Sequence, residues 1–335
     1  MRAMSLTAPG PVESRPLACV ARPVPEPGPD EIRVAVEVCA VCRTDLHVVE
    51  GELAPRRDGI VPGHQGVGHV SERGASARRF QIGDRVGVAW LRRACGTCRF
   101  CVSGRENLCL GPQFTGWDAD GGYAEQLVVP EAFAYALPAA LAPEQAAPLL
   151  CAGIIGYRSF VRSGVPQGGR LGIYGFGGAA HIVIQIARHR GCEVFVVTRG
   201  GVHRELARSL GAAWVGEAGE PPPVPLDGAI LFAPVGELVP VALAALDRGA
   251  TLAVAGIHLS RIPSLDYQAH LFQERRLCSV TANTRADGEA LLALAAEIPI
   301  RTHTQAYALE AANEALIDLK HDRVRGSALL RIGAA

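Results

Sequence analysis

The chain has 335 residues, of which 49% are hydrophobic and 20% charged, and its formal net charge is zero at neutral pH. This length predicts two domains or slightly more, with enough apolar residues for sizeable cores. The balanced charge argues against nucleic acid or an anionic membrane surface as a partner. No apolar signal-peptide core precedes Leu17, and no apolar run is long enough to cross a bilayer. We therefore expect a cytoplasmic protein with no membrane partner.

The first 130 residues predict short strands and turns with little helix. Residues 31–38 alternate between apolar and polar side chains, which is typical of a half-buried strand. Thr44 or Asp45 can cap a short helix that begins there. The glycine-rich stretch from Gly66 and the stretch 86–88 each follow a turn and predict further strands.

After residue 130 the pattern changes to alternating strands and helices, and Pro143 is typical of the first turn of a helix. Such alternation predicts a parallel sheet that is covered on both faces. Two more helices and a last strand near 328–332 are expected after Asn283. The alternating strands are expected at 171–174, 193–197, 229–232 and 251–255, and the helices at 179–189, 203–210 and 238–246.

Four cysteines, Cys95, Cys98, Cys101 and Cys109, follow the spacing C-x2-C-x2-C-x7-C. In a reducing compartment, thiols this close together are metal ligands more often than disulfides. Four thiolates suit a tetrahedral zinc ion with no open position, so we predict a structural zinc site in a lobe spanning residues 92–112. An iron–sulfur cluster is the main alternative, but the long last gap and the absence of a proline directly after Cys109 disfavour it.

A glycine-rich turn lies between a predicted strand and a predicted helix. Its sequence, Gly175-Phe-Gly177-Gly178-Ala-Ala180, matches G-x-G-x-x-G/A. The first glycine permits a tight turn, the second lets a pyrophosphate approach the backbone, and the helix N-terminus stabilises its charge. We therefore predict that Gly175, Gly177, Gly178 and Ala180 bind a dinucleotide.

The end of the next strand bears on which dinucleotide is bound. An NAD site usually places Asp or Glu there for the ribose hydroxyls, whereas this strand ends in Thr198 and Arg199. Arg199 can pair with a 2′-phosphate, and His203 and Arg204 follow one turn later. We expect NADP(H) to be favoured over NAD(H); the alternative is that Arg199 is simply solvated and both cofactors bind.

Nicotinamide chemistry on an alcohol or carbonyl needs a group that polarises oxygen, and an open zinc site with three protein ligands does this. Cys42, His64 and Cys151 are candidates, but their spacing alone does not select them. Cys39 and Cys42 also form a C-x-x-C pair that suits redox chemistry, and His69 competes with His64. Cys151 can equally be a small core residue.

A series of motifs along most of the chain resembles the zinc-dependent alcohol dehydrogenases of the medium-chain dehydrogenase/reductase family. The resemblance is strongest to the branch that includes cinnamyl alcohol dehydrogenases and other aldehyde reductases. The motifs are CRTDLH at 42–47, PGH at 62–64, GDRV at 83–86, the cysteines of 95–109, DGGYAE at 120–125, LLCAG at 149–153 and the turn at Gly175.

The resemblance implies an α/β protein with a mostly β, GroES-like catalytic domain at residues 1–152. It further implies a Rossmann domain with a doubly wound parallel sheet at 153–283, and a segment 284–335 that returns to the catalytic domain. Two zinc ions per chain are implied, with Cys42, His64 and Cys151 as ligands of the catalytic one. A homo-oligomer, dimer or tetramer, and a small alcohol or aldehyde as substrate are also implied.

The same resemblance assigns roles to residues around the catalytic zinc. Thr44 and His47 match the proton relay, because a hydroxyl can both accept and donate and an imidazole can carry the proton to water. Asp45 would orient His64; the alternative is that it only caps the helix. Gln65 stands where many relatives have Glu; it has no charge, so we expect slower ligand exchange rather than a further ligand.

Two tryptophans, Trp90 and Trp117, fall where the family lines its substrate pocket, although core packing would also explain them. We expect hydride transfer between NADP(H) and a primary alcohol or aldehyde. A zinc-independent quinone or enoyl reductase of the same family is the alternative enzyme, but such relatives usually lack both zinc sites. A zinc-ribbon interaction module is the alternative from another class, but the neutral charge and the lack of interleaved basic and aromatic residues argue against nucleic acid as its partner. A non-catalytic zinc-binding relative would have no need of Thr44 and His47.

Overall fold

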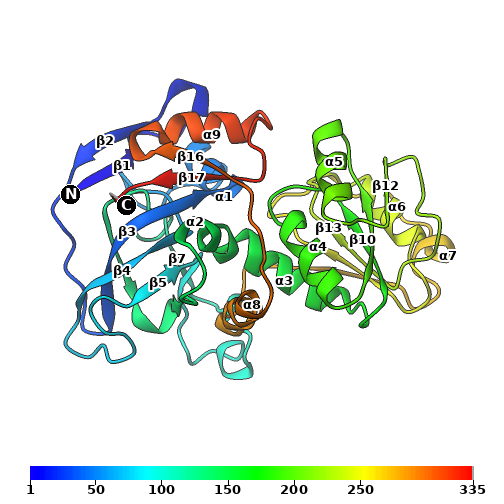
Figure 1. Ribbon diagram of the computed structural model, residues 1–335, viewed down its shortest axis with the longest axis horizontal. Helices are drawn as coiled ribbons and strands as arrows, with labels where there is room; N and C mark the ends of the chain where they lie inside the picture. The colour runs from blue at the N-terminus through cyan, green and yellow to red at the C-terminus, as the bar shows by residue number, and fades with distance from the viewer. Residues whose placement is uncertain (334–335) are drawn as a thin grey trace. The chain divides into compact units, whose positions relative to one another are not determined.

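The computed structural model describes residues 1–333, which form two compact units (Figure 1). The first unit comprises Met1–Cys151 and the C-terminal segment that begins at Ala282, and the second comprises Ala152–Thr281. The boundaries between the units therefore follow residues 151 and 281, whereas the sequence predicts boundaries after residues 152 and 283. Within the described range, no helix is both long and apolar enough to cross a membrane.

A seven-stranded sheet forms the frame of the first unit, and it combines both ends of the chain. Its strands follow the order β16-β17-β3-β4-β5-β9, and β8 also pairs with β3. The last strand, β17, runs antiparallel to β3, with Leu330 opposite Cys39, and Figure 1 shows this red strand beside the blue one. The strands are β3 (Glu31–Val41), β4 (Gly66–Arg73), β5 (Arg85–Val88), β8 (Gln126–Pro130), β9 (Ala134–Ala136), β16 (Thr304–Ala308) and β17 (Ser327–Arg331).

Strand β3 begins where the alternation predicts it and buries Ile32, Val34 and Val36 on one face. It continues three residues beyond the predicted end, and all of residues 38–41 are buried. Because β4 and β17 flank this end of the strand, β3 delivers the chain to Cys42 at a fixed place in the core.

Helix α1 (Arg43–Glu50) follows β3 directly, and its N-cap is Cys42. The Cys42 sulfur accepts the Thr44 backbone N–H at 3.3 Å, and the Asp45 carboxylate accepts the Cys42 N–H at 2.9 Å. Neither Thr44 nor Asp45 is therefore the N-cap itself, but Asp45 does contribute to the cap, as the third residue of the helix. A thiol sulfur takes the place that a hydroxyl or carboxylate usually has, and Asp45 closes the turn from inside the helix.

The other elements of the first unit surround this sheet. Helix α2 begins at Pro143, as predicted, because proline is tolerated where the first N–H groups have no partner. The core extends from Ala3 to Ile332 and so ties the two ends of the chain together. These elements are β1 (Arg2–Leu6), β2 (Leu17–Ala21), β6 (Leu91–Arg93), β7 (Gln113–Phe114), α2 (Pro143–Ala146), α8 (Arg285–Glu297) and α9 (Ala312–Lys320).

The second unit contains a six-stranded sheet, and every pairing in it is parallel, as predicted. The strand order is β12-β11-β10-β13-β14-β15, which is the doubly wound order of dinucleotide-binding folds. In such sheets ligands bind outside the carboxyl ends of the strands. The strands are β10 (Arg170–Tyr174), β11 (Glu193–Val197), β12 (Trp214–Gly216), β13 (Gly228–Leu231), β14 (Thr251–Val254) and β15 (Arg276–Ser279).

The helices of the second unit alternate with these strands. Three of them were predicted, and both ends of each lie within two residues of the expected ranges, 179–189, 203–210 and 238–246. Helix α4 starts just after the glycine-rich turn, and α5 starts just after Thr198 and Arg199. The helices are α3 (Ala152–Ser163), α4 (Ala180–His189), α5 (Gly201–Ser209), α6 (Leu238–Ala244) and α7 (Tyr267–His270).

Candidate metal centres and dinucleotide turn

Cys42, His64 and Cys151 come together in the first unit, although 22 and 109 residues separate Cys42 from the other two. The Cys42 sulfur lies 3.3 Å from His64 Nε2 and 4.0 Å from the Cys151 sulfur. Ligands at usual zinc distances on a tetrahedral ion are about 3.8 Å apart for two sulfurs and about 3.6 Å for sulfur and nitrogen. The three side chains therefore fit one metal ion and leave its fourth position open.

Asp45 fixes the orientation of His64. Its Oδ1 lies 2.9 Å from His64 Nδ1 and also accepts the Gly63 N–H at 3.2 Å. Only 2% of Asp45 and 1% of His64 are exposed, so the pair is screened from water. Because a carboxylate accepts hydrogen bonds, Nδ1 carries the proton and Nε2 is directed at Cys42. Asp45 thus has both roles considered for it, helix capping and orientation of the imidazole.

The protonation of the three side chains is coupled. Burial acts against a charged imidazole, but the Asp45 carboxylate and the Cys42 sulfur outweigh it and raise the pKa of His64 to about 10. A hydrogen bond from Cys151 holds the pKa of Cys42 well below its usual value and raises that of Cys151. These shifts favour a Cys42 thiolate beside a protonated Cys151 and a protonated His64. A divalent cation bound among the three side chains would replace the protons that Cys151 and His64 hold there.

Gly63 precedes His64 because no other residue fits there. Its φ is +98°, and a Cβ atom would lie 2.4 Å from the Tyr123 ring. The neighbouring Gln65 is 1% exposed, and its Nε2 has no hydrogen-bond partner within residues 1–333. Alternation on β4 turns His69 outward, where its Nδ1 pairs with Glu37 at 2.5 Å. Of the two histidines, the structure brings only His64 to the cysteines.

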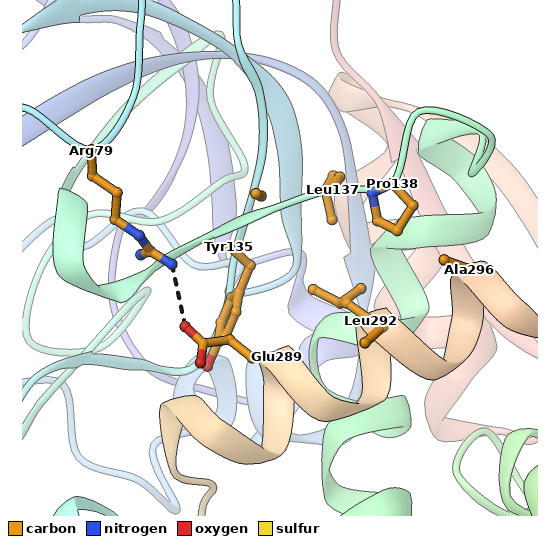
Figure 2. Close-up of a pocket in the computed structure, with 9 residues that line it drawn as sticks. Arg79, Tyr135, Leu137, Pro138, Glu289, Leu292 and Ala296 are labelled. Atoms are coloured by element: carbon orange, nitrogen blue, oxygen red, sulfur yellow. Dashed lines mark hydrogen bonds and ion pairs between the residues drawn. The ribbon is translucent and has the colours of Figure 1, made fainter.

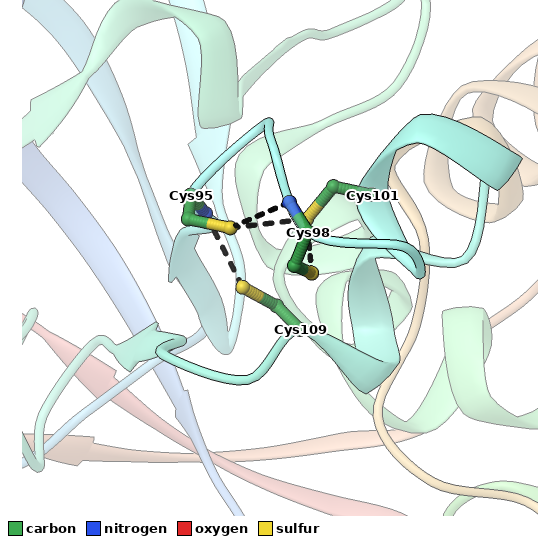
Figure 3. Close-up of side chains that lie close together, drawn as sticks. All are labelled: Cys95, Cys98, Cys101 and Cys109. Carbon is green, nitrogen blue, oxygen red and sulfur yellow. Dashed lines mark hydrogen bonds between the residues drawn. The ribbon is translucent and has the colours of Figure 1, made fainter.

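The second cluster is formed by Cys95, Cys98, Cys101 and Cys109, whose sulfurs all lie within 4.8 Å of one another (Figure 3). None of the ten cysteines forms a disulfide in the described chain. Backbone N–H groups point at the sulfurs, as from Cys95 to Cys109 at 3.2 Å and from Cys98 to Cys95 at 3.3 Å. Hydrogen bonds from the backbone at Thr97 and Cys98 lower the pKa of Cys95 to about 6, which favours a thiolate ligand.

Between Cys95 and Leu110 this lobe buries little apolar surface: Val102 and Leu110 are 72% and 74% exposed. It is fastened to the rest of the unit by Glu106, whose carboxylate accepts the Arg285 backbone N–H and side-chain Nε at 3.0 and 3.2 Å. A segment with so small a core fits a metal-folded loop.

Thr44 and His47 both lie on α1, whose N-cap is Cys42. Thr44 is 3% exposed, whereas His47 lies nearer the surface and pairs through Nδ1 with the Glu52 carboxylate. Glu52 was not predicted from the sequence. The available signal was an acid five residues after His47, just beyond the glycine that ends the helix.

A stack of three aromatic rings, the aromatic wall, lies beside His64. Its members are Trp90, Phe114 and Trp117. His64 and Trp90 pack edge to face, with ring centroids 5.1 Å apart. Trp117 donates its Nε1–H to the Ala54 carbonyl, and the Arg56 guanidinium covers its ring at 4.3 Å. Phe114 was not anticipated from the sequence.

The glycine-rich turn of the second unit has space for a ligand above it. Gly175 has φ +90°, and a Cβ atom there would lie 2.7 Å from the Ala233 nitrogen. A Cβ at Gly177, by contrast, would meet no atom within 4 Å. Gly178 completes the turn, and Ala180, fully buried, begins α4. The backbone of the turn is therefore packed against Ala233 at Gly175 and unobstructed at Gly177, where a pyrophosphate has to approach it closely.

Beyond β11, Thr198 is 7% exposed and its N–H donates to the Gly216 carbonyl at 3.0 Å. Arg199 is exposed and forms no ion pair with any described residue. Arg204, one turn into α5, pairs with Glu217 at 2.9 Å.

A separate pocket of about 330 Å³ lies in the first unit between β9 and α8 (Figure 2). Its lining is apolar except near Tyr135 and at an ion pair between Arg79 and Glu289 at 3.3 Å. None of the residues singled out from the sequence lines it. The remaining lining residues are Ala136, Leu137, Pro138, Leu292, Ala293 and Ala296.

Residues 28–139 match the family model of the alcohol dehydrogenase GroES-like domain. The chain is 55% identical over 337 residues to a probable alcohol dehydrogenase, AdhA, of Mycobacterium tuberculosis, covering 99% of this chain and 97% of that protein. It therefore belongs to the alcohol dehydrogenases of the medium-chain dehydrogenase/reductase family, which are oxidoreductases.

Two solved structures have the same fold at 27% identity. A cinnamyl alcohol dehydrogenase from Sorghum bicolor superposes with a TM-score of 0.89, covering 98% of this chain and 97% of that one. A thermostable alcohol dehydrogenase from Pyrobaculum aerophilum, solved with bound cobalt and zinc, gives a TM-score of 0.88 and covers 99% of each chain.

Proposed function

We propose that this alcohol dehydrogenase depends on zinc and transfers hydride between NADP(H) and a primary alcohol or aldehyde. The observation that carries the proposal is the difference between the two clusters. Cys42, His64 and Cys151 offer three ligands, whereas the lobe offers four. Three protein ligands are typical of a catalytic zinc with a position free for substrate, and four of a structural one.

The soft, sulfur-rich donor sets support zinc over magnesium or calcium at both clusters. The zinc-bound relative from Pyrobaculum aerophilum supports the same choice. Zinc in such an open site supplies polarisation of a substrate oxygen, and a nicotinamide supplies or accepts the hydride. The chain itself must hold the ligands, fix the substrate and move one proton.

The residues of α1 are suited to the proton transfer. The Thr44 hydroxyl can accept a proton from an alcohol and donate one in return, and it lies two residues from the ligand Cys42. His47 is the next protic group on the helix, and an imidazole can both accept and release a proton. Its contact with Glu52, whose side chain is 62% exposed, gives the proton an acceptor at the surface.

The preference for NADP(H) rests on the charges beyond β11. No carboxylate stands at Thr198, and the guanidinium of Arg199 is exposed and unpaired among the described residues. A planar guanidinium suits a phosphate better than it suits a hydroxyl.

The aromatic wall supports an apolar or aromatic substrate. Trp90 lies against the ligand His64, so a flat substituent can stack beside a substrate oxygen held at the metal. The name of the Sorghum bicolor relative, a cinnamyl alcohol dehydrogenase, supports an aryl substituent on the substrate.

We also infer a homo-oligomer, because the second unit exposes large apolar side chains around its edge strand β15. Tyr267, Phe272 and Leu277 are 61%, 56% and 36% exposed. Such a patch on an unpaired sheet edge usually marks an interface. Light scattering that returned the mass of a single chain would refute this.

A panel of alcohols and aldehydes, assayed with NADPH and with NADH, tests the proposed function. We expect turnover of aryl and unbranched aldehydes, with a higher kcat/KM for NADPH. Activity that survives removal of all zinc, or that is confined to quinones and enoyl compounds, would contradict the proposal.

A further inference from the structure

The end of the second sheet carries a carboxylate on the strand next to β11. Strands β11 and β12 are parallel with Val197 opposite Gly216, and the Thr198 N–H donates to the Gly216 carbonyl. The residues that follow on the two strands are therefore Thr198 and Glu217. An NAD-selective fold has its acid at the tip of the second strand. Here the neighbouring strand provides an acid beside that position.

Glu217 also changes the charge that a cofactor phosphate would meet. Its Oε1 lies 2.9 Å from Arg204 Nη1, with both side chains partly exposed. The Glu217 backbone N–H donates to the Glu220 carboxylate at 3.1 Å, which keeps a second acid close. Of the two arginines nearest the end of β11, Arg199 pairs with no described acid, whereas Arg204 pairs with Glu217.

On the basis of the proposed function, we propose that Glu217 is a specificity-determining residue for the dinucleotide. Its carboxylate forms an ion pair with Arg204, repels a 2′-phosphate and can accept a hydrogen bond from a 2′-hydroxyl. The site then recognises a 2′-phosphate through Arg199 alone. Its preference for NADP(H) over NAD(H) is therefore weaker than it would be if Arg199 and Arg204 both bound the phosphate.

Binding of the nucleotide fragments 2′,5′-ADP and 5′-AMP tests this without metal or hydride transfer. The two fragments differ in the 2′-phosphate, and calorimetry at low salt gives both dissociation constants. In Glu217→Gln we expect 2′,5′-ADP to bind roughly three- to fivefold more tightly, the scale of one exposed charge interaction. The affinity for 5′-AMP should stay the same or fall.

Two further variants make the result specific. Glu193→Gln removes an exposed acid at the opposite end of β11 and should leave both affinities unchanged. Adding Arg204→Gln to Glu217→Gln should abolish the gain, because Arg204 is the cation that Glu217 occupies.

Equal shifts for both fragments, or none for either, in Glu217→Gln would overturn the role of Glu217 while leaving the proposed NADP(H) site in place. Failure of the unmodified protein to bind either fragment would overturn the proposed dinucleotide site and this inference with it.

Discussion

Asp45 is the residue on which the three-ligand cluster depends, although it is not itself placed to bind the ion. One carboxylate accepts hydrogen bonds from His64, from Gly63 and from the backbone of Cys42. The same group therefore orients His64, fixes the turn before it and caps the helix start at Cys42, two of the three proposed ligands. Its burial makes each of these interactions strong.

Replacing this carboxylate should loosen the metal more than the fold. In Asp45→Asn the amide oxygen can still accept a backbone N–H, but the charge beside His64 is lost. We expect zinc affinity to fall roughly 10- to 100-fold, measured by competition with a chelator. Asp84→Asn, which alters a turn carboxylate that accepts the Gln81 N–H, is the matched control. Unchanged zinc affinity in Asp45→Asn would show that His64 needs no carboxylate.

Glu52 should affect proton transfer without affecting the metal. In Glu52→Gln, His47 loses its surface acceptor, and we expect kcat to fall about 3- to 10-fold, less than for loss of a direct general base. The solvent isotope effect should rise, and added imidazole should restore part of the rate.

Glu37→Gln provides the control for Glu52, because Glu37 pairs with His69 in the same manner on the outer face of the sheet. Similar rate losses in both variants would mean that the effect at Glu52 is structural. A rate in Glu52→Gln that equals the unmodified rate would remove it from the proton path.

At the level of elements, β10 supports the glycine turn but contains an unsatisfied group. Tyr174, its last residue, is fully buried, and its hydroxyl has no hydrogen-bond partner within residues 1–333. Burial raises its pKa well above the ordinary value, so it stays neutral. A buried hydroxyl without a partner costs free energy that a phenyl ring would not.

Tyr174→Phe should therefore raise the free energy of unfolding, by about 0.5 to 1 kcal/mol. Tyr135→Phe is the contrasting variant, because that hydroxyl accepts a hydrogen bond from Asn283 Nδ2 at 3.2 Å. We expect it to destabilise the protein. Denaturant unfolding measures both, and a Tyr174→Phe protein that unfolds more easily would show that the hydroxyl has a partner, such as water.

The elements that sequence patterns predict well are those with strong one-sided burial. The alternation of β3 and the apolar strands of the second sheet are found where expected. Strands β12, β15 and β16 were not predicted. They have three to five residues, and β15 and β16 are partly exposed, so their composition carries little periodic signal. The Cys42 cap was missed because a thiol seldom has that role.

The site divides in the same way. The lobe cysteines lie within 15 residues and reveal their cluster by spacing alone. Cys42, His64 and Cys151 are brought together only by the folded chain, and the family resemblance, not their spacing, selected them. The partners that act through space, Glu52, Phe114 and Glu217, follow from side-chain directions and strand register that no local motif encodes.

At the scale of the whole molecule, the proposed enzyme has one open and one closed metal site in the same unit of the chain. Loss of the lobe ion should unfold residues 92–112, because that segment has little core of its own. Loss of the other ion should leave the fold intact, since Cys42, His64 and Cys151 lie on elements that the main sheet and its core already hold.

The zinc content of three proteins, measured per chain together with activity, tests this most directly. We predict about two ions in the unmodified protein and about one in Cys151→Ser and in Cys109→Ser. Cys151→Ser should be inactive but fold normally, whereas Cys109→Ser should lose thermal stability. A single ion in the unmodified protein, or full activity in a Cys151→Ser protein that has lost an ion, would contradict the account.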